Sequence, residues 1–350
     1  MLERDLPRSL KLTPDRIDFT SNDYLGLSRS ADLHKRISEV YESLPVKRNG
    51  STGSRLLSGN SELVMQTEEK LAAIFRSEKT LLFDSGYSAN LAVLSTFCHR
   101  GDSILMDERC HASIKDGARL SLANKWNFRH NDLDDLDRKL QVTTNSKWIV
   151  VESIYSMDGD LCPLEDIVAL AKKYDARIIL DEAHSTGVMG TGGNGYANHL
   201  DLQKDIDIRI YTFGKAMGVH GACVAMEHWQ QNYMVNFSRP FIYTTAPSDH
   251  SVVSISCAVD YLREHIYLQE ELKSRIDQLQ SETQIHAVIV PGVEEVQRTA
   301  SLLQEKGFDV RPILSPTVRE GQERIRICLH TFNTPEQIGS LMSNLRTLGL

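Results

Sequence analysis

A lysine with glycine and apolar neighbours directly follows a short apolar run. Lys215 lies in the segment Thr212–Gly218 (Thr-Phe-Gly-Lys-Ala-Met-Gly), which begins at the end of the run Ile208–Phe213. Such neighbours can keep a lysine away from water, which lowers its pKa and makes the amine a nucleophile for Schiff-base formation. Most lysines are solvated surface residues, so Lys215 indicates chemistry only if suitable partners lie nearby.

Two other segments follow apolar runs in the same way. Asp181 ends the run Arg177–Asp181, where a carboxylate can hold the proton of a pyridine nitrogen, and His184 can hydrogen-bond a phenolic oxygen. Residues 85–90 (Ser-Gly-Tyr-Ser-Ala-Asn) join a predicted strand to a predicted helix, a position that binds phosphate. Each segment alone also fits a structural role, as a cap, an ion pair or a plain glycine turn. Because ligands of open α/β sheets bind beyond the carboxyl ends of strands, the three together predict a pyridoxal 5'-phosphate (PLP) site.

Two motif matches lack the structural context that they require. Asp181–His184 spells the Asp-Glu-Ala-His box of helicases, but that function needs a phosphate loop Gly-x-x-x-x-Gly-Lys-Ser/Thr. Gly214-Lys215 has neither the earlier glycine nor the following hydroxyl. Gly190–Gly195 matches the dinucleotide fingerprint Gly-x-Gly-x-x-Gly, yet no predicted strand leads into it. A flexible glycine loop is the better interpretation.

Composition narrows the class of protein. The chain has 350 residues, 41% of them hydrophobic, and a formal net charge of -8, which argues against nucleic acid or an anionic membrane as the main partner. None of the six cysteines forms a Cys-x-x-Cys pair, so we expect neither a zinc site nor a disulfide framework, and no metal. The N-terminus has no apolar signal core, and no apolar run is long enough for a membrane span. We expect a cytoplasmic protein.

Short apolar runs alternate with helical patterns, which predicts an α/β fold with a mainly parallel sheet. Pro163 opens one predicted helix, Leu164–Tyr174, and another spans Ser61–Ser77. The predicted strands are Thr80–Asp84, Ser103–Asp107, Trp148–Glu152, Arg177–Asp181, Ile208–Phe213 and Gly221–Met226.

The pattern changes after about residue 248, where a long predicted helix, Ser251–Gln280, leads into a smaller α+β segment. We therefore expect an N-terminal arm (1–40), a large cofactor-binding domain (41–250) and a small C-terminal domain (251–350). The segment's predicted elements are strands Ala287–Val290, Asp309–Leu314 and Arg324–Leu329, and helices Val293–Lys306 and one from Pro335 onward.

From about Phe19 to its end, the sequence resembles the α-oxoamine synthases, PLP-dependent enzymes of fold type I. Six motifs appear in the family's order: Ser21–Leu27 (Ser-Asn-Asp-Tyr-Leu-Gly-Leu), Gly50–Asn60 (Gly-Ser-Thr-Gly-Ser-Arg-Leu-Leu-Ser-Gly-Asn), Asp107–Ser113, Ser153–Gly159, Asp181–Gly187 and Thr212–Ala216. The resemblance implies a central, mainly parallel sheet sandwiched by helices, a smaller C-terminal domain and a homodimer with sites at the subunit interface.

The resemblance also implies residue roles. Lys215 would carry the cofactor through an imine and act as general base, Asp181 would pair with the pyridine nitrogen, and His111 would stack over the ring. Further cofactor contacts would come from Gly86, Tyr87, Ser156, His184 and Thr212, and from Thr245 or Thr244 toward the phosphate in the neighbouring subunit. Substrate contacts would come from Asn22 and Arg326 to the amino-acid carboxylate and from Thr317 to the acyl group. Arg324 is interpreted as a surface strand residue.

The implied reaction is a decarboxylative Claisen condensation of an amino acid with an acyl thioester. Gly50–Asn60 and Phe241–Thr245 are most similar to the member that joins L-alanine to a pimeloyl thioester, carried by CoA or by an acyl carrier protein, in biotin biosynthesis. Rivals join glycine to an acetyl or succinyl group, or serine to a long acyl group. Other PLP reactions on this fold, and a binding protein on a degenerate fold, are the remaining alternatives.

The chain departs from the family pattern at three places. Val64 stands where the family often has histidine, and Leu314–Thr317 reads Leu-Ser-Pro-Thr where many such synthases have Arg-Pro-Pro-Thr. The arm is short, so the substrate-binding arginine expected there is either Arg8 or Arg4. These departures concern the acyl substrate rather than the cofactor.

Overall fold

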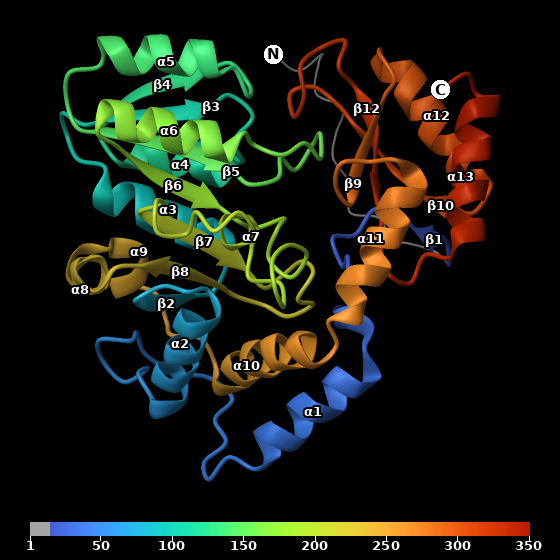
Figure 1. The fold of residues 1–350 in the computed structure, drawn as a ribbon. Coiled ribbons are helices and arrows are strands. Elements are labelled where there is room, and N and C mark those ends of the chain that lie inside the picture. Colours follow the sequence, from blue (N-terminus) through green and yellow to red (C-terminus); the bar gives the residue numbers. More distant parts are fainter. Residues whose placement is uncertain (1–14) are drawn as a thin grey trace, which may run out of the picture.

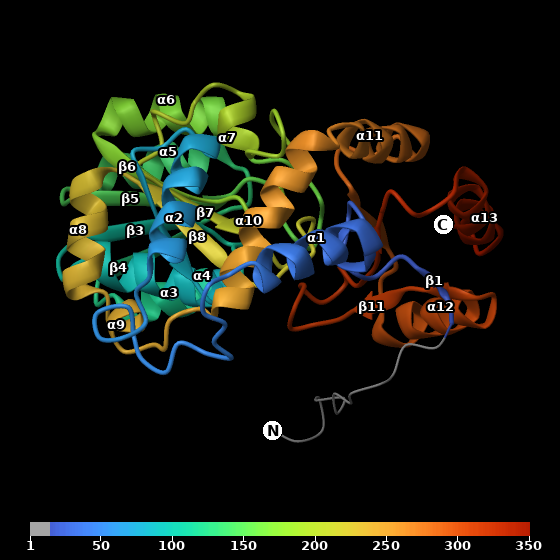
Figure 2. The ribbon, with the colours of Figure 1, turned by 90° about the horizontal axis from the view of Figure 1, so that it is seen from below.

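A computed structural model describes residues 15–350 as two bodies of unequal size joined side by side (Figures 1 and 2). The larger body is a seven-stranded sheet with helices on both faces, and the smaller body is a three-stranded sheet with helices beside it. The sequence-based prediction of a mainly parallel sheet sandwiched by helices is therefore confirmed.

The large sheet has the strand order β2-β8-β7-β6-β5-β3-β4. The pairs from β7 to β4 are all parallel, and β8 alone runs antiparallel to its two neighbours. The strands are β2 (Lys79–Phe83), β3 (Ser103–Asp107), β4 (Asn124–Phe128), β5 (Lys147–Glu152), β6 (Ala176–Asp181), β7 (Ile208–Thr212) and β8 (Ala222–Met226). Edge strand β4 is absent from the sequence prediction, because four of its five residues are exposed and the run has no apolar pattern.

Two apolar layers cover this sheet. On one face, α3 (Gly86–Phe97), α4 (Ala112–Leu120), α8 (His228–Phe237) and α9 (Arg239–Ile242) contribute the buried side chains. On the other face, α5 (Leu133–Val142), α6 (Leu164–Tyr174) and the short α7 (Tyr196–His199) do so. Because both faces are covered, strands such as β6 carry consecutive apolar residues instead of alternating ones.

The smaller body contains a three-stranded antiparallel sheet in the order β11-β12-β9. Its elements are β9 (Ile285–Ile289), β11 (Arg311–Ile313), β12 (Arg324–Cys328), α11 (Tyr267–Leu279), α12 (Val293–Glu305) and α13 (Pro335–Thr347). Near the N-terminus, β1 (Ile17–Asp18) pairs in parallel with β10 (Phe308–Asp309). The chain's first described strand therefore belongs, in space, with its last hundred residues.

Helices α1 (Ala31–Glu42), α2 (Glu62–Ile74) and α10 (Asp249–Glu264) pack together beneath the large sheet (Figure 1). A 3-10 turn, Leu27–Arg29, precedes α1. The apolar cluster formed by these helices continues into the smaller body, so the two bodies share buried side chains. The domain division at residue 250 remains a prediction.

Two sequence-predicted elements are each split in the structure. The helix expected over Ser251–Gln280 is two helices, because α10 ends where the His265 backbone N–H bonds the carbonyls of Tyr261 and Leu262. The His265 ring also stacks on Tyr261 and places Nδ1 2.8 Å from the Tyr261 carbonyl oxygen. The strand expected over Asp309–Leu314 divides at Val310, since β10 pairs with β1 while β11 pairs with β12.

Within residues 15–350, no helix has both the length and the hydropathy that crossing a membrane would require.

Candidate active site

Lys215 follows β7 and points into the protein, where its Nζ lies 2.9 Å from Nε2 of His184. Burial lowers the pKa of Lys215 to about 8, against the opposing charges of Asp181 and Glu152. At pH 7 about a tenth of the amine is then uncharged, far more than for an ordinary solvated lysine. This is the state that a carbonyl-reactive lysine requires.

Asp181 ends β6 on the neighbouring strand and is 4% exposed. Its Oδ2 accepts a hydrogen bond from Asn90 Nδ2 at 2.7 Å, and its Oδ1 accepts one from the Ala183 N–H at 2.9 Å. These donors hold the carboxylate in one orientation, facing the same space as Lys215. Asn90 comes from α3, so β6 and α3 meet at this carboxylate.

His184 is buried against Lys215 and Tyr24. Burial, and then the charge of Lys215, place the pKa of His184 well below its usual value, so the ring is neutral at physiological pH. Its Nδ1 lies 2.8 Å from the Tyr24 hydroxyl, which in turn donates to Asn22 Oδ1 at 3.0 Å. When Lys215 donates to Nε2, the Nδ1 proton is directed at Tyr24, and a polar chain runs from Lys215 to Asn22.

These side chains line a cavity of about 270 Å³. Ser85 caps α3 by accepting a hydrogen bond from the Ser88 N–H, and the first-turn residues Gly86 and Tyr87 line the cavity. A Cβ at Gly86 would collide with the Thr212 methyl, so glycine is needed at this close approach. The lining residues are Ser85, Gly86, Tyr87, Asn90, His111, Ser113, Glu152, Asp181, Ala183, His184, Thr212, Gly214, Lys215, His220 and Gly221.

A second cavity, of about 690 Å³, adjoins the first at His111, whose ring borders both. His111 Nδ1 lies 2.7 Å from the Ser113 hydroxyl, and burial lowers the pKa of the ring despite the nearby Asp181 charge. Ser156 and Thr317 line this second cavity and not the first. Ser156, which the sequence predicts to hold the cofactor, therefore does not line the smaller cavity, and its role stays a prediction.

Arg326 lies between the N-terminal segment and the loop after β5. Its Nη2 donates to Asn22 Oδ1 at 2.9 Å, and its Nε donates to the Ser156 carbonyl oxygen at 2.5 Å. Asn22 and Arg326, the predicted carboxylate pair, are thus brought together although 304 residues separate them. Both also connect, through Tyr24, to the His184 ring.

Other sequence-predicted residues lie elsewhere. Thr245 is exposed, Thr244 is half-buried, and neither lines the two cavities. The adjacent Ala246 N–H bonds the carbonyl oxygen of Gly53, which joins this segment to the glycine-rich segment. Arg4 and Arg8 lie outside the described residues.

The interpretation of Arg324 as a surface residue is wrong. Its side chain is 3% exposed and donates to the Asp158 carboxylate and to the carbonyl oxygens of Met157 and Gln322. Strand β12 alternates its side chains between the two faces of its sheet. Both arginines on this strand, at 324 and 326, therefore face the loop after β5, whose carbonyl groups accept their hydrogen bonds.

Sequence reasoning also missed a carboxylate. Glu152 is buried at the end of β5, accepts a hydrogen bond from the His111 backbone N–H, and lines the smaller cavity. Burial, together with the charge of Asp181, raises the pKa of Glu152 to about 8. The signal was available, since Glu152 ends its strand just as Asp181 ends the next one.

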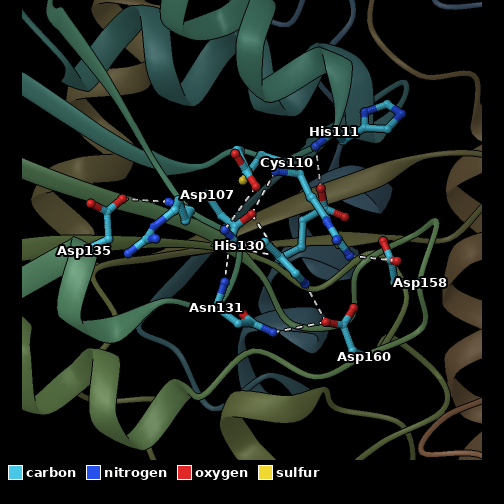
Figure 3. A network of polar contacts seen from close by, with 12 residues as sticks. Asp107, Cys110, His111, His130, Asn131, Asp135, Asp158 and Asp160 are labelled. Carbon is cyan, nitrogen blue, oxygen red and sulfur yellow. Dashed lines mark hydrogen bonds and ion pairs between the residues drawn. The ribbon is translucent and has the colours of Figure 1, made fainter. Parts of the chain in front are cut away.

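Behind the second cavity, a histidine holds two loops together (Figure 3). His130 Nδ1 contacts both oxygens of Asp107 at 3.0 and 3.1 Å, and Nε2 contacts Asp160 at 2.5 Å. Asp107 begins the loop that carries His111, and Asp160 belongs to the loop that carries Ser156. Burial alone would lower the pKa of His130, but its two carboxylate partners raise it to about 9.

A sequence profile of the aminotransferase class I and II family matches residues 14–345. The chain belongs to the aminotransferase class I and II family. Its curated relatives in the family include the 8-amino-7-oxononanoate synthase of Lysinibacillus sphaericus, 34% identical over 95% of this chain and 88% of the relative. A putative 8-amino-7-oxononanoate synthase of Bacillus licheniformis is 36% identical over 98% of this chain and 93% of the relative.

Solved structures of the family give the same picture. A serine palmitoyltransferase from S. paucimobilis with bound PLP superposes with a TM-score of 0.87 at 29% identity, over 95% of this chain and 86% of that one. The 8-amino-7-oxononanoate synthase of Francisella tularensis superposes with a TM-score of 0.83 at 26% identity, over 96% of this chain and 98% of that one. The chain is thus an enzyme of the 8-amino-7-oxononanoate synthase type, on the fold of the PLP-dependent transferases.

Proposed function

We propose that this protein uses PLP to condense L-alanine with a pimeloyl thioester, releasing carbon dioxide and a free thiol and forming 8-amino-7-oxononanoate for biotin biosynthesis. The observation that carries the proposal is the pair of cavities that meet at His111, the smaller one holding Lys215 and Asp181. The relatives named 8-amino-7-oxononanoate synthase support this choice of reaction.

The residues of the smaller cavity fit PLP. Lys215 offers an amine of lowered pKa, Asp181 a fixed carboxylate, and the N-terminus of α3 at Gly86 an anion site. Tyr87 and Thr212 complete the wall beside that helix. When bound, PLP supplies an electron sink that stabilises a carbanion next to nitrogen.

Each residue then has a role that its surroundings permit. Lys215, with a pKa of about 8, can take the α-proton of the amino acid and later return one. Neutral His184 can hydrogen-bond the phenolic oxygen of the cofactor, and Asp181 can keep a proton on the ring nitrogen. His111 can cover the ring while facing the thioester in the second cavity.

Asn22 and Arg326 can hold the amino-acid carboxylate. The guanidinium presents several donors in a planar fork that matches a carboxylate. Its hydrogen bonds go to an amide oxygen, a backbone carbonyl oxygen and the Cys328 sulfur, none of them a carboxylate, so its positive charge is available to a substrate. Thr317, on the wall of the second cavity, would contact the acyl chain.

Two measurements test the proposal separately. Borohydride reduction followed by peptide mass spectrometry should find the cofactor on Lys215, and an adduct elsewhere or none would refute the cofactor assignment. Supplying L-alanine and pimeloyl-CoA should release free thiol and carbon dioxide in equal amounts, with Lys215→Ala inactive. If no acyl thioester led to release of free thiol, the proposed condensation would be refuted.

A second condensation is favoured by one observation. The serine palmitoyltransferase from S. paucimobilis superposes somewhat better than the 8-amino-7-oxononanoate synthase of Francisella tularensis. A serine palmitoyltransferase-like or glycine C-acetyltransferase-like enzyme is therefore the alternative. Competition among alanine, serine and glycine, each with pimeloyl, palmitoyl and acetyl thioesters, decides between these reactions.

We further propose a homodimer in a reducing, cytoplasmic compartment. All six cysteines are free thiols in the structure, as expected where disulfides do not persist. Thr245 and Thr244 lie away from this chain's own cavities. A contact from them to the cofactor of a second subunit fits that position. Whether the acyl group arrives on CoA or on an acyl carrier protein is tested by offering both.

A further inference from the structure

The second cavity carries an excess of positive charge. Its lining includes four basic side chains and two acidic ones, namely Arg109, Lys115, Arg319 and Arg324 against Glu108 and Asp158. The whole chain, in contrast, has a formal net charge of -8. A basic cavity in an acidic protein favours an anionic ligand at that place.

The ion pairs show which cations make up the excess. Arg319 pairs with Glu108 at 2.5 Å. The Asp158 Oδ1 is shared, because Arg109 Nη1 lies 2.7 Å away and Arg324 contacts the same oxygen. One carboxylate therefore faces two guanidinium groups.

Arg109 is the more available of these two guanidinium groups. Arg324 is 3% exposed and is also hydrogen-bonded to two carbonyl oxygens, whereas Arg109 is 40% exposed. Over residues 15–350, the Arg109 guanidinium is near Asp158 without making a hydrogen bond of good geometry. Its donors can therefore turn to a ligand without leaving Asp158 unpaired.

Lys115 adds a second available cation. It lies on the first turns of α4, four residues after His111, and its charge acts on the His111 ring. In the part of the chain that the structure describes, its ammonium group has neither an ion-pair partner nor a hydrogen-bond acceptor. Arg109 and Lys115 thus stand on either side of His111 in the sequence.

The rest of the wall suits a hydrocarbon chain. Ala112, Met157, Pro316 and Val318 contribute apolar surface between the charged groups. A ligand that fits this cavity has an apolar stretch that begins near His111 and an anionic group at its end. A purely hydrocarbon tail would offer no anion to Lys115 and would leave Arg109 sharing the Asp158 carboxylate with Arg324.

We propose that Arg109 and Lys115 bind the free carboxylate of a dicarboxylic acyl group and thereby select it over a monocarboxylic chain of equal length. The inference rests on the proposed function, since it assumes that the acyl thioester enters the second cavity. The phosphates of an acyl-CoA are also anions that the two cations could bind. They lie a long pantetheine arm away from the reacting carbon, whereas Arg109 and Lys115 both line the second cavity, so the nearer carboxylate is the better match.

The experiment compares pimeloyl-CoA with heptanoyl-CoA on the holoenzyme, before and after Arg109→Gln. Asp158 retains Arg324 in this variant, so the fold should be kept. We expect KM for pimeloyl-CoA to rise about tenfold or more, the usual effect of losing a charged hydrogen bond, and KM for heptanoyl-CoA to change by less than about twofold. Lys115→Gln should act in the same direction. Arg298→Gln, on the exposed face of α12, controls for net charge.

Pimeloyl-N-acetylcysteamine, which has no phosphate, separates the two sources of negative charge. Its KM should also rise in Arg109→Gln. If KM in Arg109→Gln rose equally for both CoA substrates but not for pimeloyl-N-acetylcysteamine, Arg109 would be a phosphate contact and the inference would be overturned. If the wild type turns over no thioester, calorimetric binding of pimeloyl-CoA and heptanoyl-CoA replaces kinetics. A preference for pimeloyl-CoA that Arg109→Gln abolishes would still support the carboxylate site, and no preference would refute it.

Discussion

At the scale of single residues, burial governs the chemistry of the smaller cavity. Lys215 and His184 lie 2.9 Å apart, and burial lowers the pKa of both. Glu152 responds in the opposite direction, because burial and the Asp181 charge favour its protonated form. The site therefore holds less charge than its residue types suggest, and Asp181 is the anion that faces the lysine.

The lowered pKa of Lys215 predicts how cofactor uptake depends on pH. Only the uncharged amine attacks an aldehyde, so the rate at which apoprotein incorporates PLP should rise from pH 7 and level off above about pH 8. Stopped-flow absorbance of the bound cofactor measures this rate. A rate that still climbs steeply toward pH 10 would mean that the lysine titrates as an ordinary solvated one.

Gly86 gives a steric prediction. Gly86→Ala should place a methyl group against Thr212 and displace the first turn of α3, which weakens cofactor binding by about 5-fold to 150-fold if about 1–3 kcal/mol is lost. Equilibrium dialysis of PLP measures the change. Gly339→Ala, in α13 with open space around the added carbon, is the matched control and should leave PLP binding unchanged. Unchanged affinity for PLP in Gly86→Ala would contradict a close approach of the cofactor to the N-terminus of α3.

At the scale of elements, His130 ties the loop after β3 to the loop after β5 (Figure 3). His130→Gln should destabilise the protein by about 3 kcal/mol, as for removal of one partner of a buried charge pair. The folded-state pKa of about 9 lies above the ordinary value of 6.5, so this stability is fully present below about pH 6.5 and is lost as pH rises through 9.

Urea unfolding at pH 6, 7.5 and 9 tests this dependence. The stability difference between wild type and His130→Gln should be largest at pH 6 and shrink toward pH 9. His34→Gln, at an exposed position of α1, is the control and should show no such trend. A difference that grows with pH would show that the two carboxylates do not hold a charged histidine.

The sequence predicts those elements and site residues whose signals are local. Strands covered on both faces carry apolar runs, and Lys215, Asp181 and Gly86 sit at the ends of elements where such signals are clear. Strand β4 was missed because its exposed edge has no pattern. No local signal marks the end of α10 at His265, whose ring stacks on Tyr261. Shared partners such as Asp158, between Arg109 and Arg324, arise from tertiary packing alone.

At the scale of the whole molecule, two joined segments each expose a large apolar side chain. Leu57 is 84% exposed and Tyr243 is 73% exposed. The segments that carry them are joined by the bond from Ala246 to Gly53. Single exposed apolar residues are ordinary, but neighbouring ones indicate an interaction surface.

If this surface joins two copies of the chain, Leu57→Asp should shift the protein toward monomer. Light scattering after size-exclusion chromatography, over a range of concentrations, measures the mass. Ile266→Asp, at an exposed position between α10 and α11, introduces the same charge away from this surface and should leave the dimer intact. A monomeric wild type, or a Leu57→Asp variant that dimerises as tightly, would contradict the homodimer.

The contact between Asn22 and Arg326 has a consequence for biosynthesis. The guanidinium partner is synthesised 304 positions after the amide. A nascent or prematurely terminated chain can build most of the large sheet but cannot complete the carboxylate-binding pair. Assembly of that pair must therefore wait until Arg326 is made, and it closes a very long loop, a slow class of folding step.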